Sequence, residues 1–117
     1  MTGDPTGRVG RRLEDLVDIS READYLVSKG KDAYLADTAE GRLLRAAGQN
    51  IVLRVATVAE KLPAEFRDQH PEAEWDKLRA MRNLTAHHDD KVNHDFIWVA
   101  LANRVPGLIA TLGLNRA

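Results

Sequence analysis

The sequence of 117 residues contains no cysteine, which excludes disulfides, thiolate catalysis and zinc sites built on cysteine. Aromatic residues make up only 5% of the chain. No stretch approaches the roughly 20 apolar residues that a membrane-spanning helix needs. Alternating runs of β-branched residues, which indicate strands, are also missing. We therefore expect a globular all-α protein with no membrane association.

The charge balance gives no sign of a strongly basic surface, because 17 basic and 18 acidic residues leave a formal net charge of −1. Domains that bind nucleic acids usually carry a basic excess. Any chemistry on RNA must therefore come from a local site. The N-terminal segment lacks the apolar core of a signal peptide, which predicts an intracellular, cytoplasmic protein.

Apolar residues recur at steps of three and four over most of the chain, which is the pattern of amphipathic helices. Thr38 or Asp37 is suited to cap the second helix, and Pro63 should end it. Asn93 is suited to cap the last helix, which Pro106 is expected to interrupt. The predicted fold is a bundle of four to five helices in one domain over residues 10–117, after a flexible lead-in over residues 1–9. The expected helices are 10–29, 38–62, 73–86 and a segment starting at 93.

The polar chemistry is concentrated in one segment, Arg82-Asn83-Leu84-Thr85-Ala86-His87-His88-Asp89-Asp90. A metal site is one interpretation, but consecutive residues on a short loop rarely converge on one ion, and the zincin spacing is absent. A purely structural helix end is a second interpretation. A metal-free phosphodiester site is the third, and the residues alone leave all three open.

The spacing within this segment bears on the third interpretation. Asn83 and His87 are four residues apart and share one helical face. Arg82 is five residues before His87, and five residues turn a helix by about 140°. The two side chains can therefore meet through a helix end, through the length of the arginine, or across an interface between two copies of the chain.

An arginine and a histidine are sufficient in principle to cleave RNA. A histidine with an unperturbed pKa of about 6.5 can accept a proton near neutral pH. A guanidinium can bind a phosphate and the charge that develops on it. The ribose 2′-hydroxyl supplies the nucleophile, so that neither a metal nor an activated water is required.

The chain resembles the HepT-like branch of the HEPN superfamily. The members of this branch are bacterial toxins with an R-x-x-x-x-H motif. Arg82 and His87 match the motif, and Asn83 stands in its usual second place. The similarity covers roughly residues 13–112. The flanking features occur in the family's order: Leu53 to Leu62, Pro71 and Trp75, Met81-Arg82-Asn83, Val92-Asn93, Ile97-Trp98 and Val105-Pro106-Gly107-Leu108.

The resemblance implies an all-α homodimer in which two R-x-x-x-x-H motifs form one composite, metal-independent endoribonuclease site with no cofactor. By this resemblance His87 is the general base, Arg82 binds the scissile phosphate, and Asn83 orients His87 or bridges the protomers. His88 and Asp89 are further candidates for RNA contact or regulation. The expected partner is an MntA-like nucleotidyltransferase antitoxin, which attaches AMP to a tyrosine two residues after the motif histidine.

Two positions depart from the family pattern. Asp89 stands where the modified tyrosine is expected, and a carboxylate cannot form a stable phenolic AMP ester. Ala56-Thr57-Val58 stands where the family often has Gly-Glu-Ala, so that a carboxylate near the site is expected to be missing. These departures favour the alternative of a non-catalytic HEPN module that binds a nucleotidyltransferase or a nucleic acid.

Overall fold

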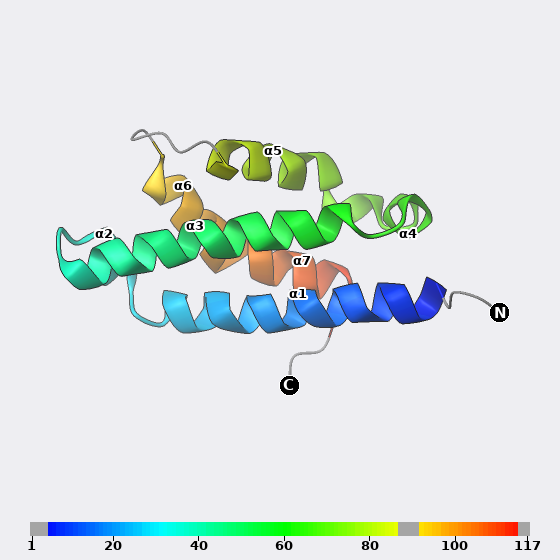
Figure 1. Ribbon diagram of the computed structural model, residues 1–117, viewed down its shortest axis with the longest axis horizontal. Coiled ribbons are helices and arrows are strands. Elements are labelled where there is room, and N and C mark those ends of the chain that lie inside the picture. Colours follow the sequence, from blue (N-terminus) through cyan, green and yellow to red (C-terminus); the bar gives the residue numbers. More distant parts are fainter. Residues whose placement is uncertain (1–4, 87–91, 115–117) are drawn as a thin grey trace.

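The computed structural model describes residues 5–86 and 92–114, and its described elements are helices throughout (Figure 1). This confirms the predicted all-α fold. No strand occurs within these ranges, and no described helix is both long and apolar enough to cross a bilayer. The elements are α1 (Pro5–Val27), α2 (Lys31–Leu35), α3 (Ala39–Glu60), α4 (Ala64–Asp68), the 3₁₀ helix η1 (Pro71–Ala73), α5 (Trp75–Ala86), α6 (His94–Val99), the π-helical segment η2 (Ala100–Arg104) and α7 (Val105–Thr111).

Two long helices, α1 and α3, run side by side in opposite directions along the molecule, which measures 53 × 31 × 24 Å (Figure 1). Helix α5 packs on another face of α3, and the C-terminal helices α6 and α7 close the bundle. Helix α3 therefore contacts most of the other elements and forms the centre of the fold. The core of α1 and α3 consists of Leu16, Ile19, Ala23, Leu26, Ile51, Val52, Val55 and Ala59, each at most 4% exposed.

Helix α1 begins at Pro5, five residues before the start expected at Gly10. Proline suits the first turn of a helix, because its missing N–H has no partner there in any case. Residues 5–9, expected as part of a flexible lead-in, therefore belong to the helix. After α1 ends at Val27, Gly30 adopts φ = 92°, a left-handed conformation that favours glycine and lets the chain turn into α2.

The start of α3 follows the sequence prediction. The Thr38 side chain accepts a hydrogen bond from the Gly41 backbone N–H at 2.9 Å, which is an N-cap. Arg45, one turn later, donates to the carbonyl oxygens of Tyr34 and Ala36, both at 2.9 Å. These bonds satisfy carbonyl groups at the end of α2 and fix the corner between α2 and α3.

Between α3 and α5 the chain forms the short helix α4 and the 3₁₀ turn η1. The indole N–H of Trp75 donates to the Arg67 carbonyl at 2.9 Å and ties the start of α5 to α4. Glu74 adopts φ = 55°, so the expected helix over 73–86 begins two residues later, at Trp75. This strained residue is the physical reason for the later start, because a left-handed conformation cannot lie within a right-handed helix.

The C-terminal helical segment continues through Pro106, which was expected to interrupt it. Proline cannot donate the hydrogen bond that an α-helix requires at its position. The chain accommodates it with the π-helical segment η2, in which the Val105 N–H bonds to the Ala100 carbonyl. Helix α7 then continues to Thr111, and Asn93 caps the start of α6 as predicted by accepting from the Phe96 N–H at 3.1 Å.

His94 at the start of α6 lies edge-on against the buried Tyr34, with ring centroids 6.3 Å apart. Its Nδ1 atom is buried without a hydrogen-bond partner among the described residues. Burial lowers the pKa of His94 below 6.5, the nearby Arg45 lowers it further, and Asp95 partly opposes both. The folded protein therefore holds this imidazole in its neutral form.

We expect the folding stability to fall as the pH drops below about 6.5, because the unfolded His94 binds a proton more readily than the folded one. Urea unfolding at pH 7.5 and pH 5.5 measures this. His94→Gln should show a smaller loss between the two pH values than wild type. An equal loss in wild type and His94→Gln would contradict the assignment.

Candidate active site

Helix α5 presents the first two residues of the R-x-x-x-x-H motif. Arg82 lies toward α3 with 39% of its side chain exposed, and Asn83 is exposed. Buried Leu78 and Met81 anchor the helix to the core. Arg82 therefore lies within the helix that the sequence predicts over residues 73–86.

The Arg82 guanidinium pairs with a carboxylate that the motif does not contain. Its Nη1 atom donates to Oε2 of Glu60, at the C-terminal end of α3 and 22 residues earlier in the chain. Arg79, one turn before Arg82, brings its Nε atom to 4.0 Å from the other oxygen of Glu60. Glu60 therefore orients Arg82, while the remaining N–H groups of the guanidinium stay available as donors.

A third arginine, Arg67, lines a small cavity beside Glu60. The lining of this cavity also includes Trp75 and Arg79. The Arg67 Nε atom is buried without a hydrogen-bond partner in the described part of the chain. Arg79 and Arg82 thus approach one glutamate at the α3–α5 interface, and Arg67 of α4 lines the cavity beside it. This excess of positive charge is suited to an anionic substrate.

The other predicted site residues, His87, His88 and Asp89, lie outside the described residues. Within residues 5–86 and 92–114, no group of three histidine or acidic side chains is placed to hold a metal ion.

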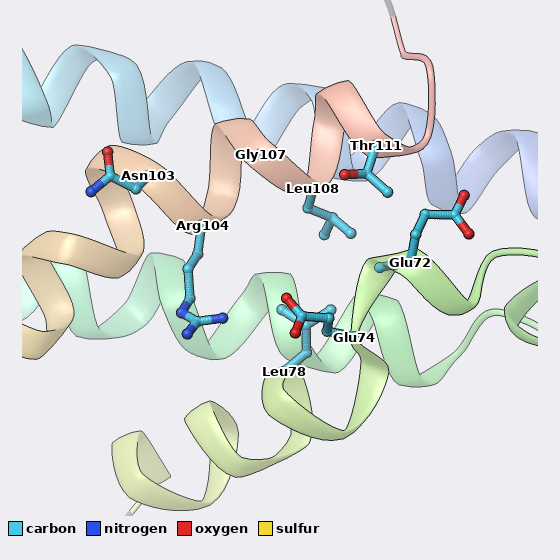
Figure 2. Close-up of a pocket in the computed structure, with 9 residues that line it drawn as sticks. Glu72, Glu74, Leu78, Asn103, Arg104, Gly107, Leu108 and Thr111 are labelled. Carbon is cyan, nitrogen blue, oxygen red and sulfur yellow. The ribbon is translucent and has the colours of Figure 1, made fainter.

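A pocket of about 250 Å³ lies between η1, the start of α5 and η2 (Figure 2). Figure 2 shows Glu74 and Arg104 extending into it from opposite sides, with Glu72 at the rim. The pKa of Glu74 is lowered, first by its hydrogen bond to Lys77 and to a smaller degree by the charge of Arg104. The mixed charge of this pocket suits phosphate less well than the surroundings of Arg82 do. Of the described motif residues, neither Arg82 nor Asn83 lines it.

Sequence reasoning missed Glu60. Ala56-Thr57-Val58 suggested that α3 brings no carboxylate to the site, and the structure corrects this, because Glu60 lies one helical turn later on α3. The spacing rule that joins residues three or four apart within a helix could have placed Glu60 near Thr57 or Ala56. It could not have paired Glu60 with Arg82, since that contact depends on how α3 and α5 pack.

We expect a double-mutant cycle on Glu60→Ala and Arg82→Ala to give a coupling of about 0.5–1 kcal/mol in the free energy of unfolding, because both side chains are partly exposed to solvent. The matched cycle of Glu60→Ala with Arg79→Ala should give less, since that pair is separated by 4.0 Å. Urea denaturation measures both cycles. Equal coupling in the two cycles would show that the direct contact with Arg82 contributes nothing specific.

Comparisons with known proteins point to one family of ribonucleases. The family model described as "Ribonuclease HepT-like" matches residues 13–113. A protein of Methanocaldococcus jannaschii named "Putative RNase MJ0127" is 22% identical over 98 residues, which cover 80% of this chain and 69% of the relative. No solved structure matches the chain significantly.

Proposed function

The chain belongs to the HepT-like ribonuclease family, and from this membership we propose that it is a metal-independent endoribonuclease acting through Arg82, Asn83 and His87. The observation that carries the proposal is the position of Arg82, a motif residue. It is oriented by Glu60, which Arg79 also approaches, and Arg67 lines the cavity beside that carboxylate. Such a site favours a phosphodiester over an uncharged substrate.

In the proposed reaction His87 removes the proton from a ribose 2′-hydroxyl. The 2′ oxygen then forms a bond to the neighbouring phosphorus, and the bond from phosphorus to the 5′ oxygen breaks. The leaving 5′ oxygen takes up a proton, so the products are a 2′,3′-cyclic phosphate and a 5′-hydroxyl. The free N–H groups of Arg82 stabilise the charge on the phosphate oxygens, and Asn83 orients the imidazole.

We further propose that the active form is a homodimer. On one straight helix the directions of Arg82 and His87 differ by about 140°, which is unfavourable for joint action on one phosphate. A site composed of Arg82 from one protomer and His87 from the other removes this difficulty. A mixture of Arg82→Ala and His87→Ala proteins, refolded together, should then regain part of the cleavage activity. A mixture as inactive as each parent would argue against a composite site.

The cellular role that we propose is that of a cytoplasmic toxin with a nucleotidyltransferase antitoxin. Asp89 does not provide the phenolic oxygen that the family's partner modifies, so we propose that the antitoxin silences this chain by binding. Co-expression should then give a stable complex whose mass shows no added AMP. Recovery of AMP on the wild-type chain would contradict silencing by binding alone.

RNA cleavage in EDTA, followed by mass spectrometry of the product ends, tests the enzymatic proposal. We expect fragments ending in a 2′,3′-cyclic phosphate. A purified protein that binds RNA without cleaving it would instead support the second candidate, a non-catalytic HEPN module. Two observations favour that candidate: Glu60 already partly neutralises Arg82, and Asp89 replaces the family tyrosine.

A further inference from the structure

The first turns of α1 carry three arginines on neighbouring positions of one face. Arg11 and Arg12 follow Arg8 by three and four residues, the spacings at which helical side chains lie next to one another. Arg12 has one acidic neighbour, Asp15, at 3.8 Å, and both side chains are more than 40% exposed, so that this pair is weak. Within the described side chains, no carboxylate pairs with Arg8 or Arg11.

These arginines form one wall of a cleft of about 520 Å³, and Lys61 and Pro63 form the other. Figure 1 places the N-terminal end of α1 and the C-terminal end of α3 at the same end of the molecule. Among the described side chains, the cleft, called the Arg8 cleft below, is thus lined by four basic residues and one proline, and by no acidic residue. Its charge contrasts with the net charge of −1 for the whole chain.

The Arg8 cleft adjoins the candidate active site through the backbone of α3. Lys61 lines the cleft, and the preceding residue, Glu60, holds Arg82. Basic side chains therefore continue from the N-terminal turns of α1, past the end of α3, to the arginines around Glu60. A polyanion with regularly spaced charges fits such a series of cations better than a single small anion does, because each cation can meet a separate charge.

We propose that the Arg8 cleft binds the sugar–phosphate backbone of single-stranded RNA next to the segment being cleaved. The inference rests on the proposed ribonuclease function, and it adds a binding site outside the R-x-x-x-x-H motif. The guanidinium groups of Arg8, Arg11 and Arg12 donate to phosphate oxygens, and Lys61 contributes a point charge from the facing wall. The cleft reads no bases, so it raises affinity for any sequence.

The test compares two double variants that remove the same charge. Arg8→Gln with Arg11→Gln alters the cleft, and Lys29→Gln with Arg42→Gln alters two cations at the other end of the α1–α3 pair. The probe is a fluorescent 15-nucleotide RNA with 2′-O-methyl groups, which cannot be cleaved because no 2′-hydroxyl is free. Fluorescence anisotropy at several salt concentrations gives Kd and its salt dependence for the full-length proteins.

We expect the cleft variant to bind RNA at least tenfold more weakly at low salt. Its slope of log Kd against log salt should fall by about 1.4, since each lost phosphate contact on a single strand contributes about 0.7. The control variant should keep the wild-type slope. For RNA cleavage, the kcat/KM of the cleft variant should fall, whereas its kcat at saturating RNA should stay at the wild-type value, because the cleft does not touch the reacting atoms.

Equal weakening in both double variants would overturn the proposal, because it would reflect total charge and not the cleft. Unchanged RNA affinity, with a loss of binding to phosphatidylserine vesicles, would also overturn it and assign the cleft to a membrane surface. The proposed function fails separately: a wild-type protein that binds the probe through the cleft but cuts no unmodified RNA would leave this inference standing.

Discussion

Arg82→Ala is expected to lower kcat for RNA cleavage by about 100- to 1,000-fold, the usual effect of removing one donor to the transition-state charge. Arg82 is the motif residue whose geometry the structure describes, and its Nη1 atom is held by Glu60. The loss should appear in kcat as well as in kcat/KM, because the interaction strengthens as charge develops on the phosphate. Steady-state cleavage of a short RNA measures it.

Arg79→Ala is the matched control, since it removes an arginine from the same helix and the same glutamate. We expect it to change kcat less than about fivefold, as is typical for a partly exposed ion pair. Arg82→Lys should recover little activity, because an ammonium group lacks the planar set of donors. Similar losses of kcat in Arg79→Ala and Arg82→Ala would show that Arg82 acts only as part of a general basic surface.

Gly41→Ala is expected to destabilise the fold by about 2 kcal/mol, although alanine normally favours a helix. Helix α3 passes so close to the end of α2 that a methyl group at Gly41 would overlap the Ala36 carbonyl oxygen. It would also lie 3.0 Å from the Ala33 carbonyl oxygen. Backbone atoms cannot move aside as a flexible side chain does, so the corner between α2 and α3 must open.

Gly10→Ala provides the comparison for this prediction. Gly10 lies within α1, and a methyl group there meets nothing within 4 Å. The same substitution should therefore stabilise the protein by about 0.5–1 kcal/mol. Thermal and urea unfolding of the two variants should give shifts of opposite sign. A stabilising effect at both positions would show that α2 does not pack on Gly41 as described.

Much of the fold follows from local sequence signals. The spacing of Leu16, Ile19 and Ala23 predicts the buried face of α1, and the caps at Thr38 and Asn93 are as expected. These signals act within a few residues and can be read from the chain directly. The continuous helix through Pro106 could not be predicted in this way, because a π-helical turn that absorbs a proline depends on packing on both sides.

The same distinction between local signals and long-range packing applies to the candidate site. The position of Arg82 on a helix follows from the periodicity around it, and the motif itself is visible in the sequence. Arg82 pairs with Glu60, and the arginines of α1 lie across a cleft from Lys61. Both contacts join residues far apart in the chain, so they depend on how three helices pack. The roles of His87, His88 and Asp89 stay predictions, since these residues lie outside the described ranges.

The most direct test of the proposed active site is single-turnover cleavage of RNA in EDTA by wild type, His87→Ala and His88→Ala. We expect cleavage by wild type and by His88→Ala, with a rate for His87→Ala lower by about 100- to 10,000-fold, the usual contribution of a general base. Circular dichroism confirms that each variant is folded. Equal rates for wild type and His87→Ala, or wild-type activity that disappears in EDTA, would contradict a metal-independent site built on the R-x-x-x-x-H motif.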